Sequence, residues 1–318
     1  MKKIFLILSI NILLICSVLL LFEYLSYERY KKIFINANCR KNITEKDHPT
    51  AKIEYPYTTK MRLFKIDDYE RDYRKPLGKN LNKKSIVIFG CSTAYGENLN
   101  ENQTLSYKLY KIIKKPVYNR AYSGWAPQHM LCQLRMKNFY SEIGNPQYFI
   151  FIYRPDHKRR LFQPQWYLYS IETCPRFKEK NGKLEEIKPF LYKFWGLYSV
   201  RHIQELYEKY VSLNPKNEEK TLKLLNMIFE ESNRLTKQHF PKSKFIIIKY
   251  QDNQTMSEKE KVMWKKIEKS GIKIIDAEKL LKDNPEKQIY KLPDYDGHPN
   301  EKVWNIIAPN LAKELNKF

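Results

Sequence analysis

The chain has 318 residues, of which 42% are hydrophobic, and its 58 Lys and Arg residues outnumber its 35 Asp and Glu residues to give a formal charge of +23. That hydrophobic content can form a packed core, so the composition excludes a wholly disordered chain. Nine glycines exclude a collagen-like protein, and five cysteines without a Cys-x-x-Cys pair argue against a structural zinc site or a dense disulfide framework.

An apolar segment opens the chain. Residues 4–22 carry no charged side chain, and about 20 such residues span the hydrocarbon core of a bilayer. Lys2 and Lys3 precede the segment and favour a membrane-anchored chain whose C-terminal part is extracytoplasmic, periplasmic or at the cell surface, although basic residues at 29–32 oppose this orientation. We expect residues 1–32 to be an uncleaved signal anchor with its flank; a cleaved signal peptide and a buried helix are the alternatives.

The positive charge is spread along mixed runs such as residues 258–269, which are typical of a solvated amphipathic helix. No nucleic-acid-binding motif accompanies the charge, so we expect no nucleic-acid partner. A charge of this size still attracts anionic partners, and a membrane surface or an acidic polymer fits a tethered domain.

After a juxtamembrane lead-in at residues 33–84, short apolar runs alternate with amphipathic segments from residue 85 onward. The patterns predict strands at 85–90, 116–119, 147–153, 244–250 and 272–276, and helices at 104–115, 127–140, 219–239, 257–269 and 301–316. Residues 154–226 interrupt this alternation and indicate an aromatic-rich insertion, with some helix near 201–211. Strands that alternate with helices pair in parallel, so we expect residues 85–318 to form a flavodoxin-like three-layer α/β/α sandwich of about five strands.

Ser92 follows the first predicted strand, in Gly90-Cys91-Ser92. In open α/β sheets, ligands bind beyond the carboxyl ends of the strands. Ser92 is therefore a candidate functional residue, and an ordinary polar loop residue is the alternative.

His298 lies in a second polar segment, Asp294-Tyr295-Asp296-Gly297-His298, just before the last predicted helix. A nearby carboxylate can orient an imidazole and stabilise the imidazolium. One His with two Asp residues does not make a zinc site, so we expect no metal and no cofactor here. A solvated loop histidine is the alternative.

The order Ser, Asp, His within an α/β sheet resembles the SGNH/GDSL hydrolase superfamily, and its flanking sequences are similar to a membrane-anchored bacterial branch. The resemblance covers roughly residues 85–160 and 240–318. Its blocks here are Gly90-Cys91-Ser92, then Asn119 to Gly124, then Asp296 (or Asp294) with His298-Pro299-Asn300.

The resemblance implies a role for each of these positions. Ser92 would be the nucleophile, and His298 would take its proton and return it to the leaving group. Asp296 would orient His298, with Asp294 as the alternative acid. The backbone N–H groups of Ser92 and Gly124 would stabilise the oxyanion.

Three positions depart from the family pattern. The family has its acid three residues before the histidine, where this sequence has Tyr295, with Asp294 and Asp296 on either side. Cys91 stands where the family has an Asp, and a nucleophilic Cys91 is a minor alternative. After the third predicted strand, Tyr153-Arg154-Pro155-Asp156-His157 lacks the Asn that donates to the oxyanion in the family. His157 is a candidate replacement because its ring can donate, and a structural Asp156–His157 pair is the alternative. Alternatively, Arg154 or Arg160 could supply a positive charge to the oxyanion in place of the missing Asn.

Trp125 and Arg160 are the candidate substrate-binding residues, and the aromatic insertion contributes Trp166 and Trp195 as further candidates. The resemblance implies a serine esterase that acts on O-acyl esters, with acetyl favoured, of an envelope glycan or lipid. An O-acetyltransferase with the same triad and envelope acyl-transfer partners is one alternative. A catalytically silent domain that binds glycan or scaffolds a complex is the other.

Overall fold

The computed structural model describes residues 11, 14–28, 74, 76–136, 138–161, 176–187, 203, 206, 218–250, 256–281 and 298–317. Within them, five parallel strands form one sheet in the order β2-β1-β3-β6-β7. The strands are β1 (Lys84–Phe89), β2 (Val117–Asn119), β3 (Asn145–Tyr153), β6 (Lys244–Lys249) and β7 (Lys273–Asp276). All five strands that the sequence predicts are confirmed, with their ends displaced by one or two residues.

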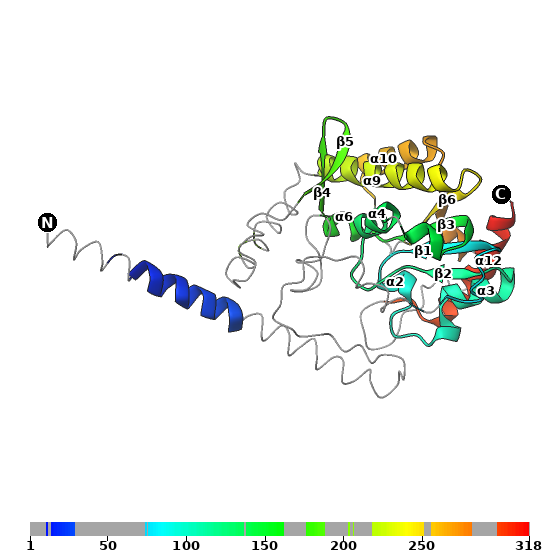
Figure 1. The fold of residues 1–318 in the computed structure, drawn as a ribbon, viewed down its shortest axis with the longest axis horizontal. Coiled ribbons are helices and arrows are strands. Elements are labelled where there is room, and N and C mark those ends of the chain that lie inside the picture. Colours follow the sequence, from blue (N-terminus) through cyan, green and yellow to red (C-terminus); the bar gives the residue numbers. More distant parts are fainter. Residues whose placement is uncertain are drawn as a thin grey trace.

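Helices cover both faces of the sheet (Figure 1). The longer ones are α3 (Leu105–Ile113), α4 (Pro127–Arg135), α9 (Glu218–His239), α10 (Glu258–Lys269) and α12 (Glu301–Asn316). Short turns of helix are α2 (Ser92–Tyr95), η2 (Glu101–Gln103), α5 (Phe139–Glu142), α6 (His157–Arg160) and α11 (Ala277–Leu280). The predicted three-layer α/β/α arrangement is therefore confirmed.

Alternate side chains of each central strand enter two separate cores, as the period-2 geometry of a strand requires. From β1, Ile86 and Ile88 pack with α3 and α12, where Trp304 is the largest fully buried side chain. The intervening Val87 and Phe89 pack with α4, α9 and α10 on the opposite face. Burial on both faces explains why the strands appear in the sequence as continuous apolar runs.

Two elements differ from the sequence prediction. Helix α4 ends at Arg135 because Met136 takes an extended backbone, whereas the predicted helix continues to 140. A two-stranded antiparallel hairpin, β4 (Arg176–Lys180) and β5 (Lys183–Ile187), lies in the predicted insertion and was not expected. Its turn is Asn181-Gly182, with φ of +52° and +75°, which is the most common signal for a tight hairpin.

Residues 14–28 are helical, and their apolar side chains are largely exposed, with Leu20 at 71%. No helix among the described residues is long and apolar enough to cross a bilayer. The first part of the predicted span at 4–22 lies outside the described residues, except for residue 11, so the anchor stays a prediction. Most of the helix expected near 201–211 also lies outside them.

Candidate active site

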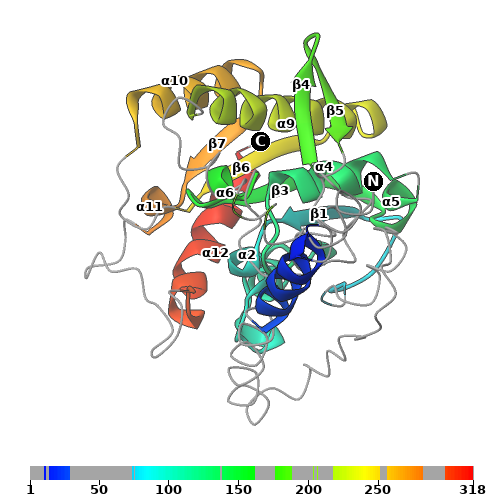
Figure 2. The ribbon, with the colours of Figure 1, turned by 90° about the vertical axis from the view of Figure 1, so that its left-hand side faces the viewer.

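The carboxyl ends of the strands face the viewer in Figure 2. The candidate residues Ser92, Gly124 and His157 follow β1, β2 and β3, and so belong to this edge. Ser92 is the first residue of α2, directly after β1, and is 9% exposed. The turn between them needs glycine, because Gly90 has φ of +151° and an added Cβ would lie 2.6 Å from the Ala94 Cβ. Only glycine adopts such a conformation without strain, so this turn fixes where the Ser92 hydroxyl lies.

Ser92 and His298 meet although 206 positions separate them. The His298 Nε2 lies 2.6 Å from the Ser92 Oγ, within hydrogen-bond distance. His298 is held just before α12, whose N-cap Asn300 accepts a hydrogen bond from the Lys302 N–H at 3.0 Å. The predicted acids Asp296 and Asp294 lie outside the described residues, so the third member of the triad stays a prediction.

The loop after β2 carries Gly124 in a left-handed conformation, with φ of +79°. Asn119 ties this loop to α2, because its amide donates to the Ala94 carbonyl at 2.9 Å while its side-chain oxygen accepts from the Ala121 N–H at 3.1 Å. The Ser123 hydroxyl also donates to the Glu97 carboxylate. The segments that carry Ser92 and Gly124 are thus joined on both sides of the site.

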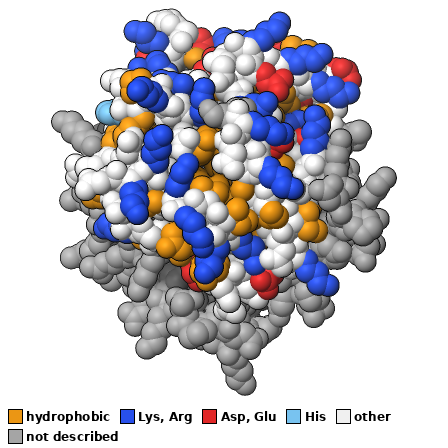
Figure 3. All heavy atoms as spheres, turned by 90° about the vertical axis from the view of Figure 1, so that its right-hand side faces the viewer, with side chains coloured by type: hydrophobic (Ala, Val, Ile, Leu, Met, Phe, Trp, Pro, Cys, Tyr) orange, Lys and Arg blue, Asp and Glu red, His pale blue; other side chains and the backbone are white. Residues whose placement is uncertain are grey.

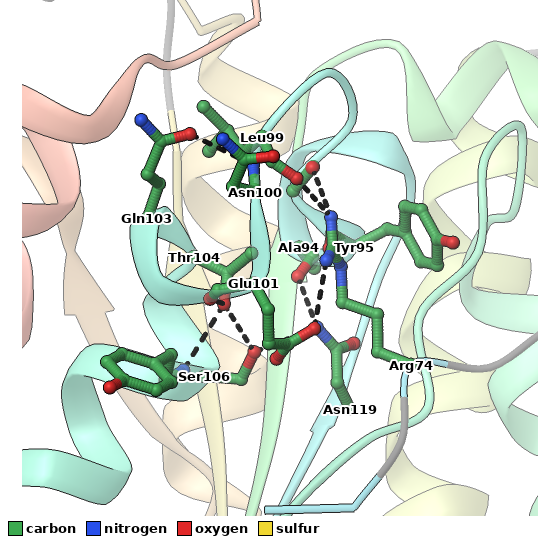
Figure 4. Close-up of polar contacts among 12 residues, drawn as sticks. Arg74, Ala94, Tyr95, Leu99, Asn100, Glu101, Gln103, Thr104, Ser106 and Asn119 are labelled. Atoms are coloured by element: carbon green, nitrogen blue, oxygen red, sulfur yellow. Dashed lines mark hydrogen bonds and ion pairs between the residues drawn. The ribbon is translucent and has the colours of Figure 1, made fainter. Parts of the chain in front are cut away.

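The Arg74 side chain binds the segment that follows Ser92 (Figure 4). Its guanidinium donates to the carbonyls of Tyr95 at 2.6 Å, Gly96 at 2.7 Å and Leu99 at 2.9 Å, and it pairs with Glu101 at 3.0 Å. These carbonyls belong to the end of α2 and the turn after it, where intrahelical partners run out. A single side chain from the N-terminal lead-in therefore holds the segment that begins with Ser92.

The loop after β3 lies against the turn that carries Ser92, and Arg154 from this loop donates to the Thr93 hydroxyl at 3.1 Å. His157 is fully buried, its Nδ1 accepts from the Arg154 N–H at 3.2 Å, and its ring packs against Phe151 and Tyr153. Burial raises the pKa of the Cys91 thiol, but the adjacent His157 and Arg160 outweigh burial and hold that pKa well below its usual value. This geometry favours a structural role for His157, beside Cys91, over the oxyanion role that the sequence suggests, and the oxyanion role stays a prediction.

Arg160 links the loops that follow β2 and β3. It is 5% exposed, donates to the Trp125 carbonyl at 3.1 Å and pairs with Asp156 at 2.5 Å. Burial raises the pKa of Asp156, but the charges of His157, Arg160 and Arg154 outweigh it and lower that pKa. The carboxylate therefore stays ionised, as the partner of Arg160, and the predicted contact of Arg160 with substrate stays a prediction.

Trp125, the other predicted substrate-binding residue, is 8% exposed and stacks on His129 with ring centroids 5.2 Å apart. Burial lowers the pKa of His129 to about 3, so this imidazole is neutral. Towards solvent, the half-buried rings of Tyr122 and Tyr95 continue the aromatic row, with centroids 5.9 Å apart. The more accessible aromatic surface beside α2 therefore belongs to the two tyrosines.

The sequence analysis singled out Ser92 and His298, but it did not predict the side-chain hydrogen bonds that join the loops around them. Arg74, Glu97 and Asn119 lie in separate segments, and no spacing rule joins them. The Asn at the end of β2 was visible as part of a motif, although its contacts were not. Within the described ranges, no cluster of three His, Cys, Asp or Glu side chains is arranged to hold a metal ion.

No family model matches the sequence, and no curated protein matches it. Among solved structures, the chain is similar to an acetyl xylan esterase from the rumen bacterium Butyrivibrio proteoclasticus, with 9% identity, a TM-score of 0.42, and coverage of 76% of this chain and 66% of that one. A GDSL-like lipase from Bacteroides thetaiotaomicron has 11% identity, a TM-score of 0.36, and coverage of 74% and 88%. A salicylyl-acyltransferase from a tetracycline biosynthetic pathway has 9% identity, a TM-score of 0.41, and coverage of 74% and 55%.

Proposed function

We propose that the chain is a serine esterase of the SGNH type that cleaves O-acyl esters, with acetyl favoured, through an acyl-enzyme. The observation that carries this proposal is the 2.6 Å approach of the His298 Nε2 to the Ser92 Oγ at the carboxyl edge of the sheet. A serine hydroxyl is a weak nucleophile until an adjacent base accepts its proton. His298 is in position to be that base.

The chemistry follows from this pair. The Ser92 Oγ attacks the ester carbonyl as its proton passes to the His298 Nε2, and the proton then leaves with the alcohol. The N–H groups of Ser92 and Gly124 stabilise the tetrahedral oxyanion, and the loss of one such donor typically slows acyl transfer about 100- to 1000-fold. Water then attacks the acyl-enzyme and the same histidine returns the proton to Ser92. Asp296, or Asp294, orients the ring in this proposal.

The proposed substrate is an acylated glycan or lipid of the cell envelope, met by a chain anchored through residues 1–32 with its sheet domain outside the cytoplasm. The apolar segment and the positive charge of the chain support this location. The half-buried rings of Tyr95 and Tyr122, which meet edge to face beside α2, supply partly exposed aromatic surface near Ser92. An O-acetyltransferase uses the same acyl-enzyme, with a sugar hydroxyl in place of water.

The test is hydrolysis of a short-chain aryl acetate by the full chain, its Ser92→Ala variant and a matched Ser270→Ala control, whose serine is exposed at the end of α10. We expect Ser92→Ala to lose roughly 10³-fold or more of the rate and the control to keep it. A fluorophosphonate probe should label the wild type at Ser92 and leave Ser92→Ala unlabelled. Failure of the probe to label Ser92 would contradict the proposal for esterase and transferase alike.

Adding a glycan acceptor to the same assay separates the two reactions. An esterase releases acetate at a rate that the acceptor does not change. A transferase forms acetylated glycan at the expense of free acetate. Labelling without turnover of either kind identifies an activated serine and excludes the aryl acetate as its acyl donor.

A further inference from the structure

The end of the molecule opposite the candidate active site is strongly basic. Because the five strands are parallel, they all begin at this end, and α3 and α12 end there. The basic face, as we call it, consists of residues 76–84, 111–116, 141–145, 240–244, 268–273 and 313–317. It holds three glutamates and twelve lysines, namely Lys79, Lys83, Lys84, Lys111, Lys114, Lys115, Lys242, Lys244, Lys269, Lys273, Lys313 and Lys317.

The sheet geometry gathers these lysines from distant parts of the sequence. Three of the five strands begin with one, Lys84 in β1, Lys244 in β6 and Lys273 in β7. All twelve are exposed except Lys115, which is half-buried. Figure 3 looks at this end of the molecule, where basic side chains surround an apolar area.

Lysines outnumber glutamates four to one on the basic face. Burial lowers the pKa of Lys115, and the charge of Lys84, from another segment, lowers it further. Of the three glutamates, Glu142 pairs with Arg120, which lies outside the basic face, at 2.7 Å, and Glu314 neutralises Lys317 at 2.5 Å. By contrast, α9 carries four acidic and four basic side chains.

Apolar side chains are exposed among the lysines. Leu81 is 45% exposed and Ile112 is 46% exposed, and both lie within the basic face. A soluble polyanion needs only the charge, whereas a bilayer surface also accepts apolar side chains at the level of its headgroups. The combination therefore favours a bilayer over a polymer as the partner.

We propose that the basic face docks on the headgroups of a bilayer rich in anionic lipid. Each lysine near such a surface contributes about 1 kcal/mol of attraction, and this attraction falls off within a Debye length. Docking in this orientation points the carboxyl edge, with Ser92, away from the bilayer by roughly the length of six to nine residues at about 3.3 Å each. The site would then reach a polymer that extends from the membrane. The inference does not depend on the ester chemistry.

The test reconstitutes the full chain in vesicles of phosphatidylcholine alone and in vesicles with roughly a third phosphatidylglycerol. A water-soluble acetylating reagent then modifies accessible lysines, which mass spectrometry quantifies residue by residue. We expect modification of Lys111, Lys114 and Lys244 to fall several-fold with anionic lipid and to recover at high salt. Any insertion of residues 4–22 is common to both lipids and does not produce this difference.

A matched pair of variants ties the effect to the basic face. Replacing Lys83, Lys84, Lys114 and Lys244 with Gln should abolish the protection of Lys111 by anionic vesicles. Replacing Lys220, Lys223, Lys259 and Lys261, exposed lysines near the starts of α9 and α10, removes the same charge and should leave that protection intact.

Three outcomes would overturn the proposal. The first is equal modification of the basic face in both lipids. The second is equal protection of the α9 and α10 lysines, which would indicate attraction without a preferred face. The third is protection by soluble polyphosphate but not by anionic vesicles, which would identify a polymer as the partner.

Discussion

His129 is a buried histidine that keeps its imidazole neutral. Its ring stacks on Trp125 and its Nδ1 accepts from the Ala126 N–H at 3.1 Å. Burial lowers the pKa of His129 to about 3 in the folded chain, whereas an unfolded histidine titrates near 6.5. Between these two values the unfolded chain binds a proton that the folded chain does not, so the free energy of unfolding falls as the pH falls.

We therefore expect the wild type to lose ~2 kcal/mol of stability between pH 7 and pH 5 that the His129→Gln variant does not lose. Urea unfolding at the two pH values measures the difference. His239→Gln, at an exposed histidine at the end of α9, is the matched control and should keep the wild-type slope. If the free energy of unfolding changed equally with pH in the wild type and in His129→Gln, the pKa of the buried ring would not be lowered, which would contradict this prediction.

At the scale of single elements, α2 depends on Arg74. Three carbonyls at the end of this four-residue helix and in the next turn have the same guanidinium as donor. A lysine keeps the charge but lacks the planar fork that reaches several acceptors at once. Because Ser92 begins α2, loss of these hydrogen bonds acts on both stability and chemistry.

We expect Arg74→Lys to lower the free energy of unfolding by about 1–3 kcal/mol and to reduce kcat more than it raises KM. Thermal unfolding and steady-state hydrolysis of an aryl acetate measure the two effects. Arg234→Lys provides the control, since Arg234 is an exposed arginine that pairs with Glu231 within α9. A variant with unchanged kcat would show that α2 holds its shape without Arg74.

The strands and the Ser92–His298 pair could be predicted from the sequence because their signals are local. Each strand is buried on two faces and so appears as an apolar run, and each site residue lies in a short motif. The contacts of Arg74 with α2, and of His157 with Cys91, depend on how distant loops pack, and no local pattern encodes them. The β4–β5 hairpin is different: its Asn181-Gly182 signal was present, but the polar strands around it lacked apolar alternation.

At the scale of the whole molecule, the candidate active site and the basic face lie at opposite edges of the sheet. Its carboxyl edge carries Ser92 and His298, and its amino edge carries the basic face. Strand β3, nine residues long, spans from one edge to the other, which is about 30 Å at 3.3 Å per residue. At physiological ionic strength, charges further apart than about 8 Å are largely screened from one another.

This separation predicts that the two ends work independently on a small neutral substrate. Replacing Lys83, Lys84, Lys114 and Lys244 with Gln should leave kcat/KM for an aryl acetate within about twofold of the wild type, because distant sites without shared partners act additively. The assay is run without vesicles, at physiological salt, beside Ser92→Ala as the inactive reference. A large loss of kcat/KM in a variant that unfolds at the wild-type temperature would mean that the basic face and the carboxyl edge are coupled through the sheet. An unchanged value would mean that the lysines act on where the protein is located and not on the rate of ester hydrolysis.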